Sequence, residues 1–354
     1  MCKSSSSPGD GQPRVRYALQ MLLGEHTLVW DNHGCMPLRP DDESFLPQLA
    51  RYRDAGVTAV TLNVGYDEVP WDNTFRMLDA FRRWVGARPG EYLLAGTTED
   101  LERARANGRL AVLFDIEGGN ALNGDIENVR RYYDAGVRWM LIAYNRNNLL
   151  GGGCQDEDSG LTAFGRKVLD EMASVGMVAC CSHTGSRTAL EVMEYSSNPV
   201  IFSHSNPSGA WRHRRNISDE LIRACARTGG VVGINGIGLF LGANDSSTDA
   251  VVRHIDYVVR LAGPEHVGLG LDYVFDRQEM DDAVRANPAT FPPEEGYGEG
   301  VGLVEPERIP DIAARLRALG YGSHELNMIL GGNWLRVARQ VWRPAGAASQ
   351  VGPV

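Results

Sequence analysis

Three histidines stand at the C-terminal ends of short apolar segments of the chain: His33, His183 and His204. Glu117 and Asp272 lie at or near the ends of two further segments of the same kind. One histidine in an apolar segment is more often a hydrogen-bonded core residue, but three of them with two acids favour a shared site. Neutral imidazole and carboxylate are the ligands of hydrolytic zinc sites, so these residues are candidate metal ligands.

Cys35 lies two residues after His33 and adds a sixth donor. A thiolate is a competent zinc ligand and has the same charge as a carboxylate. The set is large enough for two zinc ions bridged by one carboxylate, which would hold a hydroxide and polarise a carbonyl at neutral pH. Asp31 is either a further ligand, since it shares a strand face with Cys35, or an acid that supports a ligand.

Eight apolar segments, each followed by an amphipathic one, would have to position these residues. The apolar segments do not alternate with polar residues, which is typical of strands buried on both faces of a parallel sheet. Eight such units in series predict a (β/α)8 TIM barrel, with a doubly wound open sheet as the alternative. The C-terminal ends of barrel strands form the catalytic mouth, so the candidate ligands should meet there. The predicted strands are 27–33, 58–64, 110–117, 139–144, 178–183, 200–205, 231–237 and 267–273.

The sequence as a whole predicts one catalytic domain over residues 21–343. The stretch 1–20 is rich in serine, glycine and proline and is expected to be a disordered tail, as is 344–354. An acidic segment at 275–303 is rich in proline and glycine and predicts a loop over one barrel mouth, where it could act as a lid. Helices are expected at 306–319 and 323–341.

The composition of the chain argues against two classes of binding partner, nucleic acids and membranes. The chain has 354 residues with 45 acidic and 35 basic side chains and a net charge of −10, which argues against nucleic acid as a partner. No apolar run is long enough to cross a membrane, so no membrane partner is expected. The six cysteines accompany no secretory signal, which predicts free thiols and a cytoplasmic location. Barrels of this kind often dimerise, but the sequence leaves a homodimer open.

Several motifs together resemble the membrane (renal) dipeptidase family, peptidase family M19. The family consists of metal-dependent dipeptidases with an amidohydrolase-like barrel, and the resemblance extends from about residue 28 to residue 341. It rests on DNHGCMP at 31–37, DIEGG at 115–119, SHT at 182–184, PVIFSHSNP at 199–207, RRN at 214–216, HVGLGLDY at 266–273 and GGNWLRV at 331–337.

This resemblance implies a role for each site residue. His33 would bind the first zinc, Glu117 would bridge both ions, and the remaining two histidines, His183 and His204, would bind the second. Asp272 would handle the proton of the bridging water. Arg215, next to Arg214, would bind the terminal carboxylate of the substrate, a task suited to a planar guanidinium.

The chain departs from the family pattern at two of these positions. Cys35 replaces the aspartate of the His-x-Asp motif, and if it does not bind metal the site would hold one ion instead of two. Tyr144 stands where the family has a histidine that contacts the substrate carbonyl. A phenol can still donate a hydrogen bond to an oxyanion, so Tyr144 is a candidate for both catalysis and substrate binding.

The leading hypothesis is a zinc-dependent, dipeptidase-like hydrolase that cleaves a dipeptide or small amide by attack of metal-bound hydroxide. Tyr144 would stabilise the oxyanion and Asp272 would pass the proton to the leaving amine. Two alternatives share the fold: a one-metal enzyme acting on a metabolite that is not a peptide, and a catalytically inactive binding protein.

Overall fold

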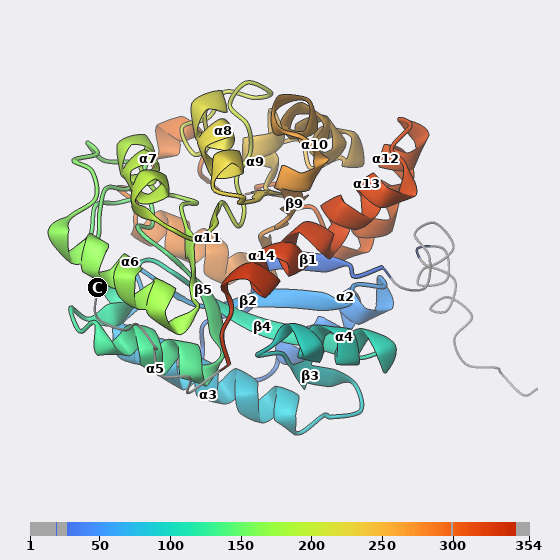
Figure 1. Cartoon of the computed structure of the whole chain (residues 1–354), viewed down its shortest axis with the longest axis horizontal. Helices are drawn as coiled ribbons and strands as arrows, with labels where there is room; N and C mark the ends of the chain where they lie inside the picture. Colours follow the sequence, from blue (N-terminus) through green and yellow to red (C-terminus); the bar gives the residue numbers. More distant parts are fainter. Residues whose placement is uncertain (1–18, 20–26, 299, 345–354) are drawn as a thin grey trace, which may run out of the picture.

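A ring of parallel strands enclosed by helices forms the centre of the protein (Figure 1). The computed structural model describes residues 19, 27–298 and 300–344. Apart from residues 19 and 344, the predicted tails 1–20 and 344–354 therefore lie outside the described residues. The strands are β1 (Trp30–Cys35), β2 (Ala59–Tyr66), β3 (Tyr92–Leu94), β4 (Leu110–Glu117), β5 (Val137–Leu141), β6 (Val178–Cys180), β7 (Val200–Ile201), β8 (Val232–Ile234), β9 (Val267–Leu269) and β10 (Tyr273–Val274).

Strand pairing confirms the (β/α)8 barrel. Eight strands are hydrogen-bonded in the order β7-β6-β5-β4-β2-β1-β9-β8, and a parallel bridge between Phe202 and Val232 joins the two ends of this series. All strand pairs are parallel. The short strand β3 was not expected; it pairs with the first residues of β4. The last predicted strand is split into β9 and β10, because Asp272 between them has a left-handed φ of 57°.

Helices cover the outside of the ring, and their ends follow the expected chemistry. Gly136 and Gly176 end α5 and α6 with φ values of 113° and 93°, which only glycine adopts readily. Ser218 and Ser247 cap the first turns of α8 and α10 through their hydroxyls. The helices are α2 (Ala50–Asp54), α3 (Trp71–Gly86), α4 (Thr98–Ala106), α5 (Glu127–Ala135), α6 (Ala163–Val175), α7 (Ser186–Tyr195), α8 (Asp219–Arg227), α9 (Gly238–Leu241), α10 (Thr248–Ala262), α11 (Arg277–Ala286), α12 (Ile309–Ala318), α13 (Ser323–Asn327) and α14 (Asn333–Val341).

The side chains of strand β4 alternate between the packed core outside the ring of strands and the interior of the barrel, where the site lies. Leu110, Val112, Phe114 and Ile116 pack in the larger apolar cluster with residues of the outer helices. The alternate residues face the interior: apolar Ala111 and Leu113 come first, and Asp115 and Glu117 follow towards the C-terminal end. The interior is therefore apolar at one end of the barrel and polar at the other, where the predicted ligands lie.

Helix α14 closes the apolar end of the barrel. In Figure 1 it lies across the ring of strands, and its Trp334 donates from Nε1 to the carbonyl of Leu269 at 3.1 Å. Trp334, Val337 and Val341 pack in the same cluster as the interior strand residues. Water is thus excluded from one end, which leaves the opposite mouth for chemistry.

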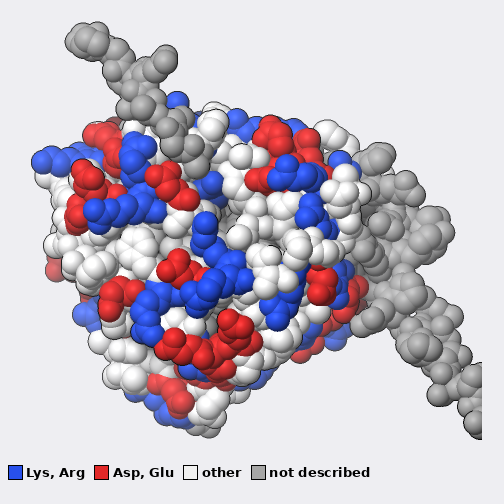
Figure 2. All heavy atoms as spheres, turned by 90° about the horizontal axis from the view of Figure 1, so that it is seen from below, with Lys and Arg blue, Asp and Glu red and all other residues white. Residues whose placement is uncertain are grey.

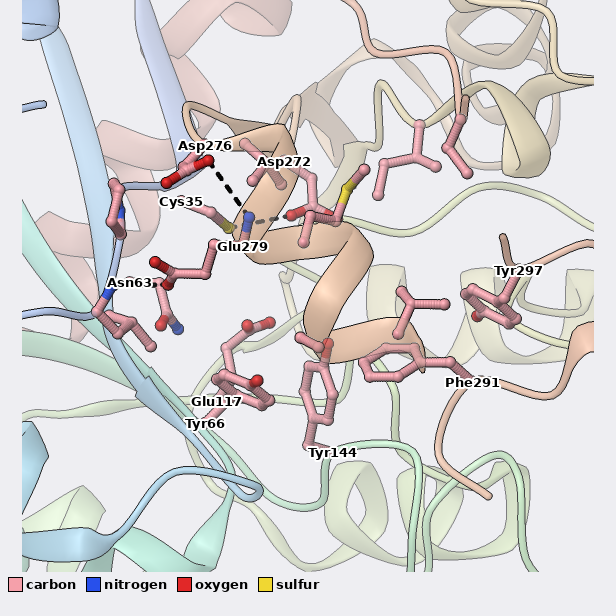
Figure 3. A pocket seen from close by; sticks show the side chains of 18 of the residues that line it. Cys35, Asn63, Tyr66, Glu117, Tyr144, Asp272, Asp276, Glu279, Phe291 and Tyr297 are labelled. Carbon is pink, nitrogen blue, oxygen red and sulfur yellow. Dashed lines mark hydrogen bonds between the residues drawn. The ribbon is translucent and has the colours of Figure 1, made fainter. Parts of the chain in front are cut away.

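The segment 275–303 differs from the irregular loop that its composition predicted. It contains the ten-residue helix α11, whose first turn is capped by Asp276 through bonds from the amides of Gln278 and Glu279. The helix lies over the mouth of the barrel, where several of its side chains line the cavity described below (Figure 3).

The surface charges and the cysteines of the described residues give no further indication of function. On the face shown in Figure 2, acidic and basic side chains are interspersed. Five cysteines fall within the described residues, and all five are free. No helix in the described part of the chain is both long and apolar enough to span a bilayer.

Candidate metal centre

Three histidines converge on one carboxylate at the polar end of the barrel. Glu117 Oε1 lies 3.5 Å from Nε2 of His33, 3.5 Å from Nε2 of His183 and 3.1 Å from Nε2 of His204. The Nε2 atoms of His183 and His204 are 2.9 Å apart. All four residues are buried. The structure thus brings together the four ligands that were expected from strands β1, β4, β6 and β7 and the turns that follow them.

The donor set fits a cation. Glu117 Oε1 is buried and has no hydrogen-bond partner, which is costly unless another group satisfies it. The second ring nitrogen of each histidine is already engaged: Nδ1 of His183 donates to Asn145 Oδ1 at 2.7 Å, and Nδ1 of His204 lies 2.8 Å from Ser203 Oγ. These contacts orient the rings with Nε2 towards Glu117, as metal-binding histidines require.

Cys35 and Asp272 form a second donor group around His33. Cys35 Sγ lies 3.5 Å from His33 Nε2 and 3.3 Å from Asp272 Oδ1, and His33 Nε2 lies 3.4 Å from the same Asp272 oxygen. The other Asp272 oxygen accepts from Asn235 at 2.9 Å. Cys35 is therefore placed where a ligand could contact an ion held by His33, and Asp272 adjoins the same position.

The acidic groups around His33 lie close together and are buried, and both facts shift their pKa values. Burial, with the neighbouring acids Asp272 and Asp115, raises the pKa of Glu117 to about 8. Burial would lower the pKa of His33, but Glu117 and Asp115 outweigh it and raise that pKa well above its usual value. Burial also raises the pKa of the Cys35 thiol. A bound cation would lower the pKa values of all three groups, because it stabilises the deprotonated form of each.

The two histidines in the turns that follow β6 and β7 are electrostatically different. Burial, with the positive charges of Arg215 and His33 nearby, holds the pKa values of His183 and His204 well below the usual range. Both rings are therefore neutral at physiological pH, which is the state that binds metal.

A bulge in β1 turns His33 into the barrel. Residues 31–34 of β1 span only residues 60–62 of β2, so β1 holds one extra residue. Asn32 faces the interior, where its Oδ1 accepts from Trp139 Nε1 at 3.2 Å, and the adjacent His33 also faces the interior. A regular strand would have placed these neighbours on opposite faces.

The carboxylate of Asp31 makes its hydrogen bonds outside the candidate ligand group, which favours a supporting role over a ligand role. Its Oδ2 accepts from the Tyr52 hydroxyl at 3.1 Å and its Oδ1 accepts from the amide of Leu271 at 2.8 Å. Asp31 therefore supports the turn that carries Asp272.

Tyr144 lies against the candidate metal ligands. Its ring stacks on that of His183 with the centroids 4.1 Å apart, and it lines the cavity. Asp67 fixes its backbone, because Asp67 Oδ2 accepts from the amide of Tyr144 at 3.1 Å and from the side chain of Asn148 at 2.8 Å. The phenol is thus held at the edge of the ligand group.

The two arginines of the RRN motif have different environments. Arg215 is buried, and it donates to Ser205 Oγ at 3.0 Å and to the His204 carbonyl at 2.8 Å, while its Nε has no partner. Arg214 is exposed and donates to the carbonyl of Cys154 at 2.8 Å. Arg215 is therefore the arginine next to the candidate metal ligands.

A cavity opens beside the ligands and includes residues that sequence reasoning missed (Figure 3). Asn63 is at the polar end, and its position late in a predicted apolar strand could have indicated it. Asn145 follows Tyr144 and orients His183 from a left-handed φ of 56°, for which asparagine is one of the more tolerant residues. Phe291 and Tyr297 line the far side, and no local pattern distinguishes them.

A parallel eight-stranded barrel with three histidines and a shared carboxylate at its mouth defines a class, the metal-dependent hydrolases of the amidohydrolase type. Residues 46–287 match the model of the family described as membrane dipeptidase (peptidase family M19). The chain belongs to this family and is a metal-dependent hydrolase of the dipeptidase type.

One curated relative and two solved structures illustrate what the chain is similar to. A protein of Klebsiella pneumoniae, described as "Uncharacterized protein in pqqA 5'region", is 30% identical over 286 residues, which are 77% of this chain and 98% of the relative. An amidohydrolase from Pseudomonas aeruginosa has 26% identity and a TM-score of 0.81, covering 92% of this chain and 99% of that one. A metallopeptidase from Rhodobacter sphaeroides, solved with a phosphinate mimic of L-Ala-D-Ala, shares the fold at 19% identity with a TM-score of 0.74, over 89% and 100% of the two chains.

Proposed function

We propose that this protein hydrolyses a dipeptide or a closely similar small amide with two zinc ions as cofactors. The observation that carries the proposal is the convergence of three imidazole Nε2 atoms on the unpartnered Oε1 of Glu117. Glu117 would bridge the ions, His183 and His204 would hold one, and His33 with Cys35 would hold the other. When bound, zinc supplies Lewis acidity that polarises the scissile carbonyl and makes water nucleophilic at neutral pH.

Asp272 is the residue proposed to move the proton. Its Oδ1 lies 3.4 Å from His33 Nε2, beside the reacting centre, and Asn235 holds its other oxygen. From this position Asp272 would accept the proton of the attacking water and deliver it to the leaving amine. The Tyr144 hydroxyl is proposed to donate to the developing oxyanion; burial raises its pKa well above the usual value, so it remains a donor.

Arg215 is proposed to bind the terminal carboxylate of the substrate. Two of its nitrogens are held by Ser205 and the His204 backbone, while the buried Nε has no partner in the described structure. A buried guanidinium with a free donor next to the ligands would recognise an anionic end of the substrate. This supports a free dipeptide over an internal peptide bond.

Metal content and hydrolysis test the proposal together. Protein purified without chelator should contain about two zinc ions per chain by plasma mass spectrometry and should hydrolyse members of a panel of L,L and L,D dipeptides. One ion per chain without dipeptide hydrolysis would favour the one-metal enzyme acting on another metabolite. Absence of both metal and hydrolysis would contradict the proposal in favour of a binding protein.

A further inference from the structure

The cavity beside the metal ligands has a polar end and an apolar wall. Cys35, Asn63, Glu117 and Asp272 lie at the polar end (Figure 3). The opposite wall is built from the chain after β1, from α9, from α11 and from the segment that follows α11. Its principal side chains are those of Leu38, Leu239, Phe240, Met280, Val284 and Phe291.

Aromatic rings make part of this wall continuous. The ring of Phe291 lies 6.1 Å from that of Tyr144 and 5.5 Å from that of Tyr297, with interplanar angles of 72° and 63°. Tyr297 in turn lies 6.1 Å from Phe240 at 68°. These near-perpendicular arrangements are the favourable ones for aromatic pairs, and they leave ring edges and faces available to another apolar group.

The charged residues of the wall are already paired with Arg39. This arginine donates to Asp276 Oδ2 at 3.0 Å and forms an ion pair with Glu279. The other Glu279 oxygen accepts from the amide of Leu38 at 3.0 Å. No lysine or arginine among the described residues belongs to this wall of the cavity. A charged substrate group placed against this wall would therefore lose water without gaining a partner, which is unfavourable.

We propose that this wall selects a large aliphatic or aromatic side chain of the substrate. The substrate class is then a dipeptide-like amide with at least one apolar side chain larger than alanine. The inference rests on the proposed hydrolytic function, because it assumes that the substrate amide lies at the metal ligands. Helix α11 acts here as a specificity element, and Ala283 and Met280 are the positions from which it would contact that side chain.

The first experiment compares dipeptides that differ in one side chain. The series Xaa-Ala and Ala-Xaa, with Xaa as alanine, leucine, phenylalanine, lysine or glutamate, shows which of the two side chains meets the wall. In one of the two series we expect kcat/KM for leucine and phenylalanine to exceed that for lysine and glutamate at least about tenfold, since a few buried methylenes supply that discrimination. Binding of phosphinate analogues of the same dipeptides, measured by calorimetry, should follow the same order.

A matched pair of variants tests the assignment to α11. Ala283 lines the cavity, whereas Ala286 of the same helix is exposed. Ala283→Trp should lower the ratio of kcat/KM between the phenylalanine and alanine substrates at least about tenfold, and Ala286→Trp should leave it unchanged. Met280→Lys is a second variant that does not fill the cavity; it should raise kcat/KM for the glutamate substrate relative to the leucine one. Circular dichroism and metal content verify that each variant is folded and loaded.

The outcomes separate this inference from the proposed function. Equal hydrolysis of apolar and charged substrates, or equal effects of the two tryptophan variants, would overturn the specificity role while dipeptide hydrolysis remained intact. If no dipeptide is cleaved but the phosphinates still bind in order of apolar size, the wall is retained and the hydrolytic function is wrong.

Discussion

The two halves of the candidate metal centre are built from different chemical groups around the same carboxylate, Glu117. On the side of β6 and β7, two neutral histidines are oriented by the uncharged groups of Asn145 and Ser203. On the side of β1 and β9, one histidine is oriented by the carboxylate of Asp115 at 3.1 Å and accompanied by a thiol and a second carboxylate. We call the first the neutral half, because uncharged groups orient its histidines, and the second the anionic half, because it contains the carboxylates of Asp115 and Asp272.

This difference bears on where the chain departs from its family. Cys35, which the family resemblance places at the aspartate of a His-x-Asp motif, falls in the anionic half, where a thiolate would keep the charge of a carboxylate. The neutral half retains both expected histidines. We therefore expect the β6–β7 half to hold an ordinary hydrolytic metal position and the β1 half to depend on whether Cys35 ionises when metal binds.

The largest effect is expected in the neutral half. His204→Ala removes one of the three imidazoles that surround Glu117 Oε1, so zinc content should fall by about one ion per chain. Hydrolysis should fall more than about 100-fold, beyond the loss caused by removing a residue that merely supports a ligand. Mass spectrometry and dipeptide assays measure both quantities. The exposed His324→Ala is the matched control, and full metal with full activity in His204→Ala would refute the assignment of the site.

Substitutions at Cys35 test the anionic half. Cys35→Ala should lose the metal held with His33 and keep the other, whereas Cys35→Asp should retain both ions, because a carboxylate restores an anionic donor. In cobalt-substituted protein, the wild type should show a thiolate-to-cobalt charge-transfer band that both variants lack. A wild-type spectrum without that band, together with unchanged metal content in Cys35→Ala, would mean that Cys35 is not a ligand.

Substitutions of Asp115 and Ser203, which orient His33 and His204, should differ in their effects on metal affinity. Asp115→Asn removes the anionic partner of His33 and should weaken metal binding in that half by about 10–100-fold, measured by competition with a chelating dye. Ser203→Ala removes only a hydroxyl from His204 and should have a smaller effect. Equal effects of the two variants would remove the distinction between an anionic and a neutral half.

A histidine outside the candidate site, His254, offers a test of whether burial lowers the pKa of histidines in this protein. It lies on α10, away from the metal ligands, and donates to the Leu241 carbonyl at 3.0 Å, while burial lowers its pKa to about 4. Between pH 6.5 and pH 4 only the unfolded state binds this proton, so stability falls as the pH falls through that range.

Replacing His254 should reduce this pH dependence. In His254→Gln, the loss of unfolding free energy between pH 7 and pH 5, measured by urea denaturation, should be smaller than in the wild type by about 1–2 kcal/mol. An identical loss in both proteins would show that burial does not depress this pKa. The low pKa values of His183 and His204 would then have to come from the charges of Arg215 and His33 and not from burial.

Much of the fold could be predicted because its signals are local. Apolar runs of strand length mark the strands, glycines such as Gly136 mark helix ends, and a polar residue late in a strand marks the mouth of a barrel. The ligand types at His33 and Glu117 were recognisable for the same reason. The short strand β3 was missed because it has only three residues, and α11 was missed because its segment is rich in proline and glycine on either side.

The parts of the site that depend on contacts between distant segments could not be predicted. Whether Asp31 faces the metal ligands depends on a bulge that exists only in the pairing of β1 with β2. The role of Asp67 depends on amides more than 50 residues away. The apolar wall is formed by side chains from four separate segments, and none of those segments shows a pattern that indicates it.

Residue types and their strand-end positions are properties of the chain itself, so the barrel, a candidate ligand set and, through the family resemblance, the hydrolytic class could be predicted from the sequence. The direction of each side chain is different, because it depends on register, on bulges and on partners that come close only after folding. Packing in three dimensions placed Cys35 between His33 and Asp272, turned Asp31 away and laid α11 over the mouth. Those long-range contacts define the neutral half, the anionic half and the apolar wall beside them.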